Sequence, residues 1–448
     1  MSDLLSVGIS GLTAYRAALT AIGDNVANAE TPGYSRRTVS LREAGNAGGG
    51  GVGMGTSLLF SGATAHSVER IWDDFRAADA RVSSGLAGRA QVRQQWLTAV
   101  ESALGDTGHD VGTLVGKFYN AAVNLSVNPG DRLGRASVLS ALEEAAGAMR
   151  GTANALSKVA AGISRAAQLE VDATNGDIAK LSEINLALLA AEPGRSSHAA
   201  LQDQRDRLID SISARIDVTA DIADNGTVTL TLASDAGTKL LDLNRRSLLV
   251  VVPAADGRLS MQLSSGGTIV PLAPGAGTLS GLIDVAASTA DKRATLDGLA
   301  SNFAADVNDW QAAGLNPAGN PGAALLAIAG GAAGIRVTTT DPAAIAAASA
   351  TADNGNLLDL PAMRGVDGAE SRWAALVAGQ AQALAAAKSE ANAATTRRDN
   401  SLASRDEIIG IDLDREAADL LRYQQAYGAA ARIIQTARDT LQSILDLF

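Results

Sequence analysis

Few side chains in this sequence could carry out catalysis or hold a metal ion. Cysteine is absent, which excludes disulfides, thiolate zinc ligands and cysteine nucleophiles. The three histidines, His66, His109 and His198, lie far apart in the sequence and do not form the HExxH spacing of zinc proteases. Neither GxSxG nor GxxxxGK[ST] occurs. We therefore expect no catalytic residue, no metal and no cofactor, and the chain is not expected to be an enzyme.

Two patterns resemble ligand-binding loops but lack the required context. Gly48, Gly50 and Gly53 satisfy GxGxxG, which binds dinucleotides only between a buried strand and a helix N-terminus, and neither is predicted here. We interpret Gly45–Gly55 as a connector. Asp412 and Asp414 lack the glycine and the terminal glutamate of a calcium loop, so we expect them to cap a helix.

Composition limits the possible partners. The 448 residues are 46% apolar but only 3% aromatic, which favours long Ala- and Leu-rich helices over a large core around a pocket. The net charge of -11 argues against nucleic-acid binding. No run of about 20 residues is free of polar side chains, so we expect no membrane insertion. Met1–Leu5 carries Asp3 and no basic residue, and a cleaved signal peptide is not expected.

Both ends of the chain have a regular pattern of apolar residues. Residues 4–28 place apolar side chains three and four positions apart, as in an amphipathic helix. Gly8 and Gly11 would weaken this helix unless a neighbour approaches closely. The last helix, predicted from Asp412 to Phe448, has an unbroken heptad pattern at Leu413, Ala417, Leu420, Gln424, Tyr427, Ala431, Ile434, Arg438, Leu441, Leu445 and Phe448.

Between the ends, the pattern is helical with one β-rich interruption. Helical stretches are predicted at 68–100, 111–125, 135–189, 201–216, 279–310 and 372–398. From 217 to 278 the period changes to two, and Asn225-Gly226 predicts a hairpin turn. The predicted fold is mainly α with an inserted β domain. Its domains are 1–45 plus 405–448 (terminal coiled coil), 46–216 plus 279–404 (helical bundle) and 217–278 (β-rich).

The two terminal helices should depend on partners. Their apolar stripes are narrow, whereas ordering a helix opposes folding at every residue. We expect them to be loose in the monomer and to fold on association. A single helix buried within its own chain is the alternative explanation of the heptad. Gln424 and Arg438 interrupt the predicted seam, and we expect them to meet a neighbouring subunit.

The ends also carry a family resemblance. Asn25-Val26-Ala27-Asn28 with Thr31-Pro32-Gly33-Tyr34-Ser35-Arg36 resembles the N-terminal motif of bacterial flagellar axial proteins of the rod, hook and hook-associated group. The run from Ile411 to Tyr427, IDLDREAADLLRYQQAY, resembles the C-terminal motif of the hook-associated protein 1 family. Asn128-Pro129, Leu201–Asp206 and the helix near 279–310 resemble this family too. Region 311–370 is shorter than in many relatives, which suggests that a large outer domain is missing.

The resemblance implies a structural role in the flagellum. Relatives form the junction layer between hook and filament, on which the filament grows, and the flagellar type III apparatus exports them without a cleaved signal. The implied partners are identical subunits, the hook protein, the second hook-associated junction protein next to the filament, and an export chaperone at the C-terminal helix. The implied location is extracellular. Two alternatives are a different axial subunit and an enzyme such as a peptidoglycan hydrolase.

The candidate site is therefore an assembly interface on the terminal helices. Its predicted residues combine the apolar stripes with the conspicuous motif positions: Leu5, Ile9, Leu12, Tyr15, Leu19, Ile22, Val26, Asn28, Pro32, Gly33, Tyr34, Leu413, Ala417, Leu420, Tyr423, Gln424, Tyr427, Ala431, Ile434, Arg438, Leu441 and Leu445.

Overall fold

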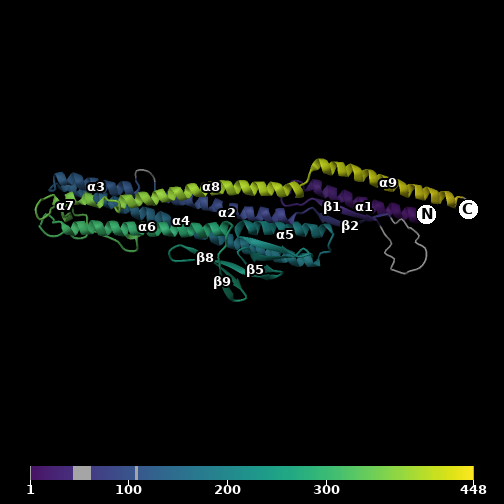
Figure 1. Cartoon of the computed structure of the whole chain (residues 1–448), viewed down its shortest axis with the longest axis horizontal. Helices are drawn as coiled ribbons and strands as arrows, with labels where there is room; N and C mark the ends of the chain where they lie inside the picture. Colours follow the sequence, from purple (N-terminus) through teal and green to yellow (C-terminus); the bar gives the residue numbers. More distant parts are fainter. Residues whose placement is uncertain (1, 44–61, 106–108, 447–448) are drawn as a thin grey trace. The chain divides into compact units, whose positions relative to one another are not determined.

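The computed structural model describes residues 2–43, 62–105 and 109–446 (Figure 1). The predicted connector Gly45–Gly55 and Phe448 lie outside the described residues. The helices are α1 (Ser2–Ala27), α2 (Asp74–Ala103), α3 (Val111–Val127), α4 (Arg132–Ala190), α5 (Ser196–Arg215), α6 (Thr278–Ala313), α7 (Gly355–Asp359), α8 (Ala369–Ile409) and α9 (Leu413–Leu445).

The strands are short and pair locally. They are β1 (Arg37–Glu43), β2 (Ala63–Arg70), β3 (Val218–Ile222), β4 (Val228–Leu232), β5 (Asp235–Asp242), β6 (Arg245–Arg246), β7 (Leu248–Pro253), β8 (Leu259–Ser265), β9 (Thr268–Leu272), β10 (Leu326–Ala327) and β11 (Arg336–Val337). The predicted class, mainly α with an inserted β region, is confirmed. One boundary was wrong: residues 68–70 belong to strand β2, which pairs with β1, and helix α2 starts only at Asp74.

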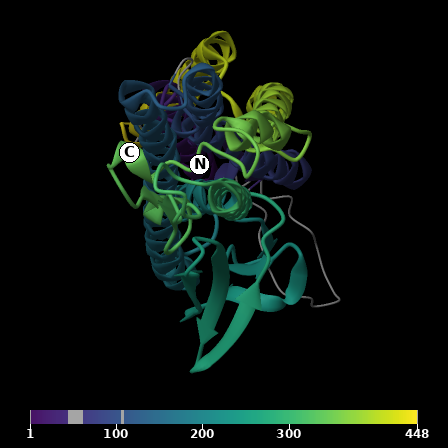
Figure 2. The same cartoon turned by 90° about the vertical axis from the view of Figure 1, so that its left-hand side faces the viewer.

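The β region between α5 and α6 forms two separate sheets, with strand orders β3-β4-β5-β6 and β7-β8-β9. The hairpin predicted at Asn225-Gly226 is confirmed: β3 pairs antiparallel with β4, and Gly226 takes a φ of +83° that favours glycine. Val228, Leu230 and Leu232 alternate into the interior, as the period of two requires. The three-stranded sheet contacts α6 through β8 and lies beside the helices (Figure 2).

Contacts divide the chain into two compact units. The first contains residues 1–84, 174–248 and 396–448, and the second contains 85–173 and 249–395. Helices α2, α4 and α8 each contribute residues to both units. This division differs from the three-part domain organisation expected from the sequence, which stays a prediction.

The second unit has a conventional hydrophobic core. Phe118 from α3 and Phe303 from α6 meet edge-to-face with ring centroids 5.9 Å apart, and both are fully buried. Leu142, Met149 and Leu156 from α4 are fully buried in the same cluster. Short segments from 325 to 360 close one end of this core, held by hydrogen bonds such as Trp310 Nε1 to the Asn356 carbonyl (2.6 Å). Region 311–370 is thus an integral part of the second unit.

Candidate assembly interface

Helices α1 and α9 lie side by side and bury small residues against each other (Figure 1). A Cβ atom on Gly8 would lie only 2.6 Å from Ile434 Cγ1, and one on Gly11 would lie 3.6 Å from the Ala430 Cβ. The two backbones approach closely because these positions have no side chain. The explanation offered for Gly8 and Gly11 from the sequence, close contact with a neighbouring element, is therefore confirmed.

The small residues buried between the helices lie next to predicted seam positions. On α9 the buried positions are Glu416, Ala430 and Ala437, each one residue before a predicted position. On α1 the buried positions include Ala14, Ala18, Ala21 and Asn25. Ile434, a predicted position, is the residue that Gly8 meets most closely, and small residues next to the predicted positions are also buried because they gave little apolar signal.

The predicted interface residues therefore fall into three groups. Ile22 is buried, and those partly buried are Leu5, Leu12, Tyr15, Leu19, Asn28, Tyr34, Leu420, Tyr423, Tyr427, Ala431 and Ile434. Those exposed are Ile9, Val26, Pro32, Gly33, Leu413, Ala417, Gln424, Arg438, Leu441 and Leu445. Gln424 and Arg438 are thus outside the α1–α9 contact and face solvent in the isolated chain.

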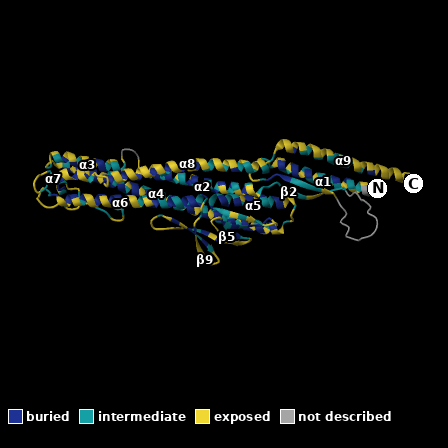
Figure 3. Ribbon diagram, in the orientation of Figure 1, coloured by how far each residue is buried: buried dark blue, intermediate teal, exposed yellow. Residues whose placement is uncertain are grey.

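Large apolar side chains remain on the outside of the helix pair. Leu421 is 60% exposed and Leu445 is 67% exposed, and Ile433 and Ile444 are also exposed. Figure 3 shows α9 as largely exposed along its length. Over Leu4–Ala27, α1 is also long and apolar enough to cross a membrane by length and composition alone. Helices that pack against other helices pass the same test, and α1 packs against α9.

Polar residues of the two terminal motifs hydrogen-bond to one another beside this helix pair, and we call this group of residues the clasp. The Asn25 Nδ2 donates to Glu416 Oε2 on α9 (3.0 Å) and to the Arg37 carbonyl (2.9 Å), and its Oδ1 accepts from the Arg37 N–H and the Tyr34 hydroxyl. Arg36 Nε donates to Glu416 Oε1 at 2.6 Å, and the Glu416 side chain is fully buried. The turn at Thr31–Tyr34, in which Gly33 has a φ of +72°, returns the chain so that Arg36 and Arg37 meet Asn25.

A row of ion pairs continues from this clasp across β2 to α5, α2 and α8. Asp203 pairs with Arg37 (3.1 Å) and with Arg70 (3.2 Å), although the Arg70 Nε is not aligned for a hydrogen bond. Further contacts of the row include Arg70–Asp206 (2.7 Å), Arg81–Asp206 (3.3 Å), Arg81–Asp210 (2.7 Å) and Arg405–Asp210 (2.9 Å). The clasp thus joins residues from both ends of the chain to its middle.

Burial raises the pKa of two groups in this region. Burial raises the pKa of Tyr34 to about 12, and the nearby positive charge of Arg37 opposes this rise. Burial also raises the pKa of Asp203, against the opposing effects of Arg70 and Arg37. Because an unpaired buried charge is strongly unfavourable, each member of the row depends on its partners.

Sequence reasoning missed the residues that make the clasp. Asn25, Arg36 and Glu416 lie in the motifs that carry the resemblance, but they were not among the predicted interface positions. A polar residue at a buried position of a helical stripe, such as Asn25 or Glu416, was the available signal. Asp412 behaves as predicted: its side chain accepts from the N–H groups of Asp414 and Arg415 and caps α9.

Metal ligands do not converge in the part of the chain that the structure describes. Within it, no group of three or more His, Asp or Glu side chains could hold a metal ion. The paired carboxylates Glu143 and Glu144 instead accept from Arg150 and Lys117 on the protein surface.

Comparison with known proteins decides the family. Residues 97–326, more than half of the chain, match the family described as the flagellar hook-associated protein FlgK helical domain. This chain belongs to the flagellar hook-associated protein FlgK family. Two further families match the ends: residues 5–34 match the flagella basal body rod protein family, and residues 404–447 match the flagellar basal body rod FlgEFG protein C-terminal family.

Curated relatives agree with the FlgK family. The flagellar hook-associated protein 1 of Bacillus subtilis is 26% identical, over 97% of this chain and 96% of that protein. The Escherichia coli protein of the same name is 25% identical over 73% of this chain, and the chain spans only 60% of its length. The resemblance to flagellar axial proteins seen in the terminal motifs is thus confirmed.

A solved structure agrees on the fold. The flagellar hook junction protein FlgK from Burkholderia pseudomallei superposes with a TM-score of 0.66 at 13% identity, over 73% of this chain and 99% of that one. At this identity the likeness shows the fold alone. The sequence match therefore shows the family, and the solved structure supports the helical architecture.

Proposed function

We propose that this FlgK family member is a structural subunit of the bacterial flagellum that assembles as the layer between hook and filament. Copies pack through the outer faces of α1 and α9, and the filament grows on this layer. The subunit has no catalytic reaction of its own. The observation that carries the proposal is the helix pair: it buries glycine and alanine inside and leaves Leu421, Leu445 and other large apolar side chains outside.

The exposed apolar side chains of α9 would gain free energy if another subunit covered them. Each exposed leucine would gain about 1.5–3 kcal/mol on full burial, so several of them on one helix favour association. Exposed apolar residues on monomeric proteins are normally scattered, whereas Leu413, Leu421, Ile433, Leu441, Ile444 and Leu445 all lie on α9. The predicted interface residues that face solvent, including Gln424 and Arg438, are part of the proposed surface.

Further partners follow from the family rather than from this geometry. The proposal includes the hook protein on one side and the second hook-associated junction protein on the other. It also includes export by the flagellar type III apparatus, with an export chaperone bound to α9, and an extracellular location in the flagellum. The exposed apolar face of α9 would need protection before assembly, which is what a chaperone supplies.

Deleting the gene tests the role, and surface variants test the interface. Deletion should leave hooks without filaments in electron micrographs, with flagellin lost to the medium. Leu421→Asp with Leu445→Asp should give the same phenotype, because a polymer would bury both charges unpaired. The monomer should fold normally, since both side chains are already exposed.

A matched control makes the same kind of change elsewhere. Leu133→Asp with Val366→Asp also places two charges at exposed apolar positions, but in the second unit. These cells should keep their filaments. Normal filaments with the α9 variant, at wild-type levels of secreted subunit, would contradict the proposed interface.

A further inference from the structure

The proposed assembly needs two different contact surfaces on each copy. In a ring or helical layer of identical subunits, one surface of a copy meets a different surface of the next copy. The proposed function assigns only one of these surfaces, the outer face of α9. The second has to be an exposed face that matches α9 in shape and charge, and the start of α2 has both properties.

The start of α2 exposes apolar side chains on one side. Phe75 is 82% exposed, and Val82, seven residues later, is 56% exposed. Ala78 lies between them and is exposed too. Because seven residues make about two helical turns, these three side chains share one side of the helix. We call Phe75, Ala78 and Val82 the α2 face. Another copy that covered this face would bury its apolar area.

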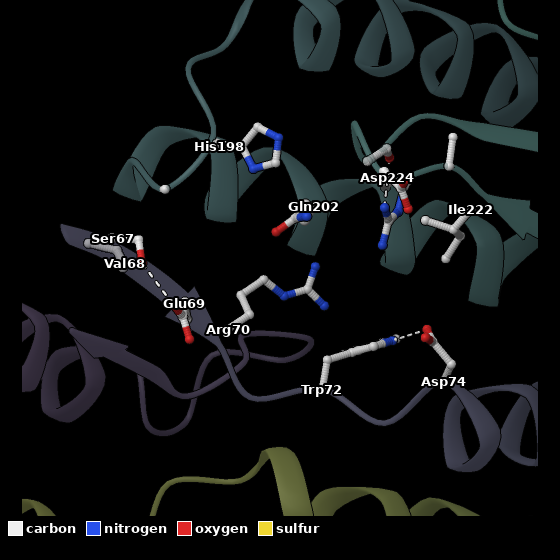
Figure 4. A pocket seen from close by; sticks show the side chains of 14 residues that line it. Ser67, Val68, Glu69, Arg70, Trp72, Asp74, His198, Gln202, Ile222 and Asp224 are labelled. Atoms are coloured by element: carbon white, nitrogen blue, oxygen red, sulfur yellow. Dashed lines mark hydrogen bonds between the residues drawn. The ribbon is translucent and has the colours of Figure 1, made fainter. Parts of the chain in front are cut away.

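The exposed charge beside the α2 face is negative. Arg76 and Arg81, the basic residues in this part of α2, contact other parts of their own chain. Asp74 is exposed and accepts from Trp72 Nε1 at 2.9 Å, which holds its carboxylate at the first turn of α2 (Figure 4). Within the described residues, Asp74 forms no ion pair, and Asp79 meets a basic side chain only at 3.9 Å. A partner for this face should therefore be basic.

The outer side of α9 carries the complementary features. Leu421, which is 60% exposed, and Gly428 are seven residues apart, the same spacing as Phe75 and Val82. A Cβ atom on Gly428 would meet no described atom within 4 Å, so packing within this chain does not require glycine there. Glycine weakens a helix, but it leaves room for a large side chain of another copy. Arg432 follows one turn later and is exposed.

We propose that the α2 face of one subunit docks antiparallel on α9 of the next subunit, with the Phe75 ring seated over Gly428. Seven residues counted in opposite directions then place Val82 against Leu421. A large side chain thus meets the glycine, and two exposed apolar side chains cover each other. A parallel arrangement with the ring in the same place would carry Val82 away from Leu421.

The same register also matches charge. Residues 420–438 of α9 contain three arginines and neither Asp nor Glu. In the antiparallel register, Asp74 comes within about one turn of Arg432, which has no ion pair of its own among the described residues. Opposite charges at the edge of a contact favour one orientation over the other. This inference rests on the proposed assembly of identical subunits.

Crosslinking between copies tests the contact, because the chain contains no cysteine of its own. Cells that lack the native gene would carry two differently tagged copies, one with Ala78→Cys and one with Gln425→Cys. Both positions are exposed, and the register places them opposite each other. A bis-maleimide that reaches about 10 Å, the spacing of packed helices, should join the two tags in isolated flagella. Gln442→Cys is the matched control for Gln425→Cys, because it is an exposed glutamine about 25 Å further along α9 and should not crosslink.

A change of size tests the seat of the ring. Gly428→Leu should lower the crosslinked fraction about tenfold, because the leucine occupies the space of the Phe75 ring. Phe75→Ala in the same chain should restore crosslinking, which a misfolded α9 would not allow. Gly176→Leu is the matched control, since Gly176 is also a helical glycine with no described atom within 4 Å of an added Cβ. It should leave the crosslinked fraction unchanged.

The outcomes separate this contact from the proposed function. Subunits that are present in the isolated flagella but do not crosslink would overturn the contact and leave the proposed function standing. Unchanged crosslinking in Gly428→Leu would also overturn the contact. Absence of the wild-type subunit from isolated flagella would overturn the proposed function, and the contact with it.

Discussion

The terminal helix pair and the core of the second unit are both helical, but they are stabilised in different ways. In the core, the fully buried side chains are large, such as Phe118, Phe303 and Met149. Between α1 and α9, the buried residues are mainly glycine and alanine, and the large apolar residues of α9 face outward. Burial of apolar area therefore stabilises the core far more than it stabilises the pair.

The helix pair buries little apolar area, but it has several buried polar contacts. Asn25, Arg36 and Glu416 are buried together and hydrogen-bonded to one another or to the Arg37 backbone. Buried polar groups of this kind fix a unique register but add little net stability over an apolar contact. We therefore expect that a change in the pair leaves the core folded and that, in the proposed assembly, a partner covers the outer face of the pair.

The largest effect is expected from a cavity in the core. Phe303→Ala should lower the free energy of unfolding of the second unit by about 3–5 kcal/mol, because it removes a fully buried ring that packs edge-to-face on Phe118. Phe75→Ala is the control, since Phe75 is 82% exposed, and its effect should stay within about 0.5 kcal/mol. Urea unfolding measures both. Similar losses from the two variants would show that the core is not the main source of stability.

Loss of the buried carboxylate in the clasp should act mainly on the pair. Glu416→Ala leaves Arg36 and Asn25 without their partner on α9, and we expect a loss of up to about 3–5 kcal/mol, limited by the stability of the pair itself. Hydrogen exchange should become faster in α1 and α9 and stay unchanged in α3. Glu407→Ala removes an exposed carboxylate and should change neither. Equal acceleration in α3 would contradict the separation of the two regions.

The sequence predicted the elements better than their contacts. The Asn225-Gly226 hairpin, the Asp412 cap and the helices, apart from the wrong start at residue 68, depend on nearby residues and were confirmed. The ion pair between Arg36 and Glu416 joins residues 380 positions apart, and no local pattern reveals it. Strand β2 was missed over 68–70 because it pairs with β1 rather than following a pattern of its own.

The small residues buried between the terminal helices were not predicted for a simpler reason. Apolar periodicity weights large side chains, yet the closest approach of two helices is at small ones. Gly8 meets Ile434, which was a predicted position, whereas Gly11 meets Ala430, which lies next to the predicted Ala431. Gly8 and Gly11 lie on the contact face, but Gly23 of the same helix meets no atom within 4 Å, so glycine alone does not identify that face.

The same substitution, glycine to alanine, at two positions of α1 tests which residues lie in the contact. Gly8→Ala should destabilise the α1–α9 contact by about 1–3 kcal/mol, since the new Cβ would lie 2.6 Å from Ile434 Cγ1. Gly23→Ala meets no atom within 4 Å and should stabilise α1 by about 1 kcal/mol through helix propensity. Hydrogen exchange of α1 measures both. Ile434→Ala removes Cγ1 and should partly rescue Gly8→Ala, and failure to do so would place the clash elsewhere.

The smallest effect is expected from tyrosine ionisation, which gives each region its own probe. Burial raises the pKa of both Tyr34, in the clasp, and Tyr119, in the core, to about 12. Since the unfolded value is about 10, the neutral phenols stabilise the fold below pH about 10, and this contribution is lost as the pH rises from about 10 to about 12. Tyr34→Phe and Tyr119→Phe should each remove one late-ionising group from the ultraviolet titration.

Combining this titration with the clasp variant tests the comparison directly. In Glu416→Ala, opening of the pair should expose Tyr34 to solvent and return its pKa toward about 10. Tyr119 should keep its raised pKa, because its core does not depend on Glu416. The ultraviolet titration should then show one late-ionising tyrosine instead of two. Two late-ionising tyrosines in this variant would mean that apolar packing alone keeps α1 and α9 together, and the clasp would then set register without adding stability.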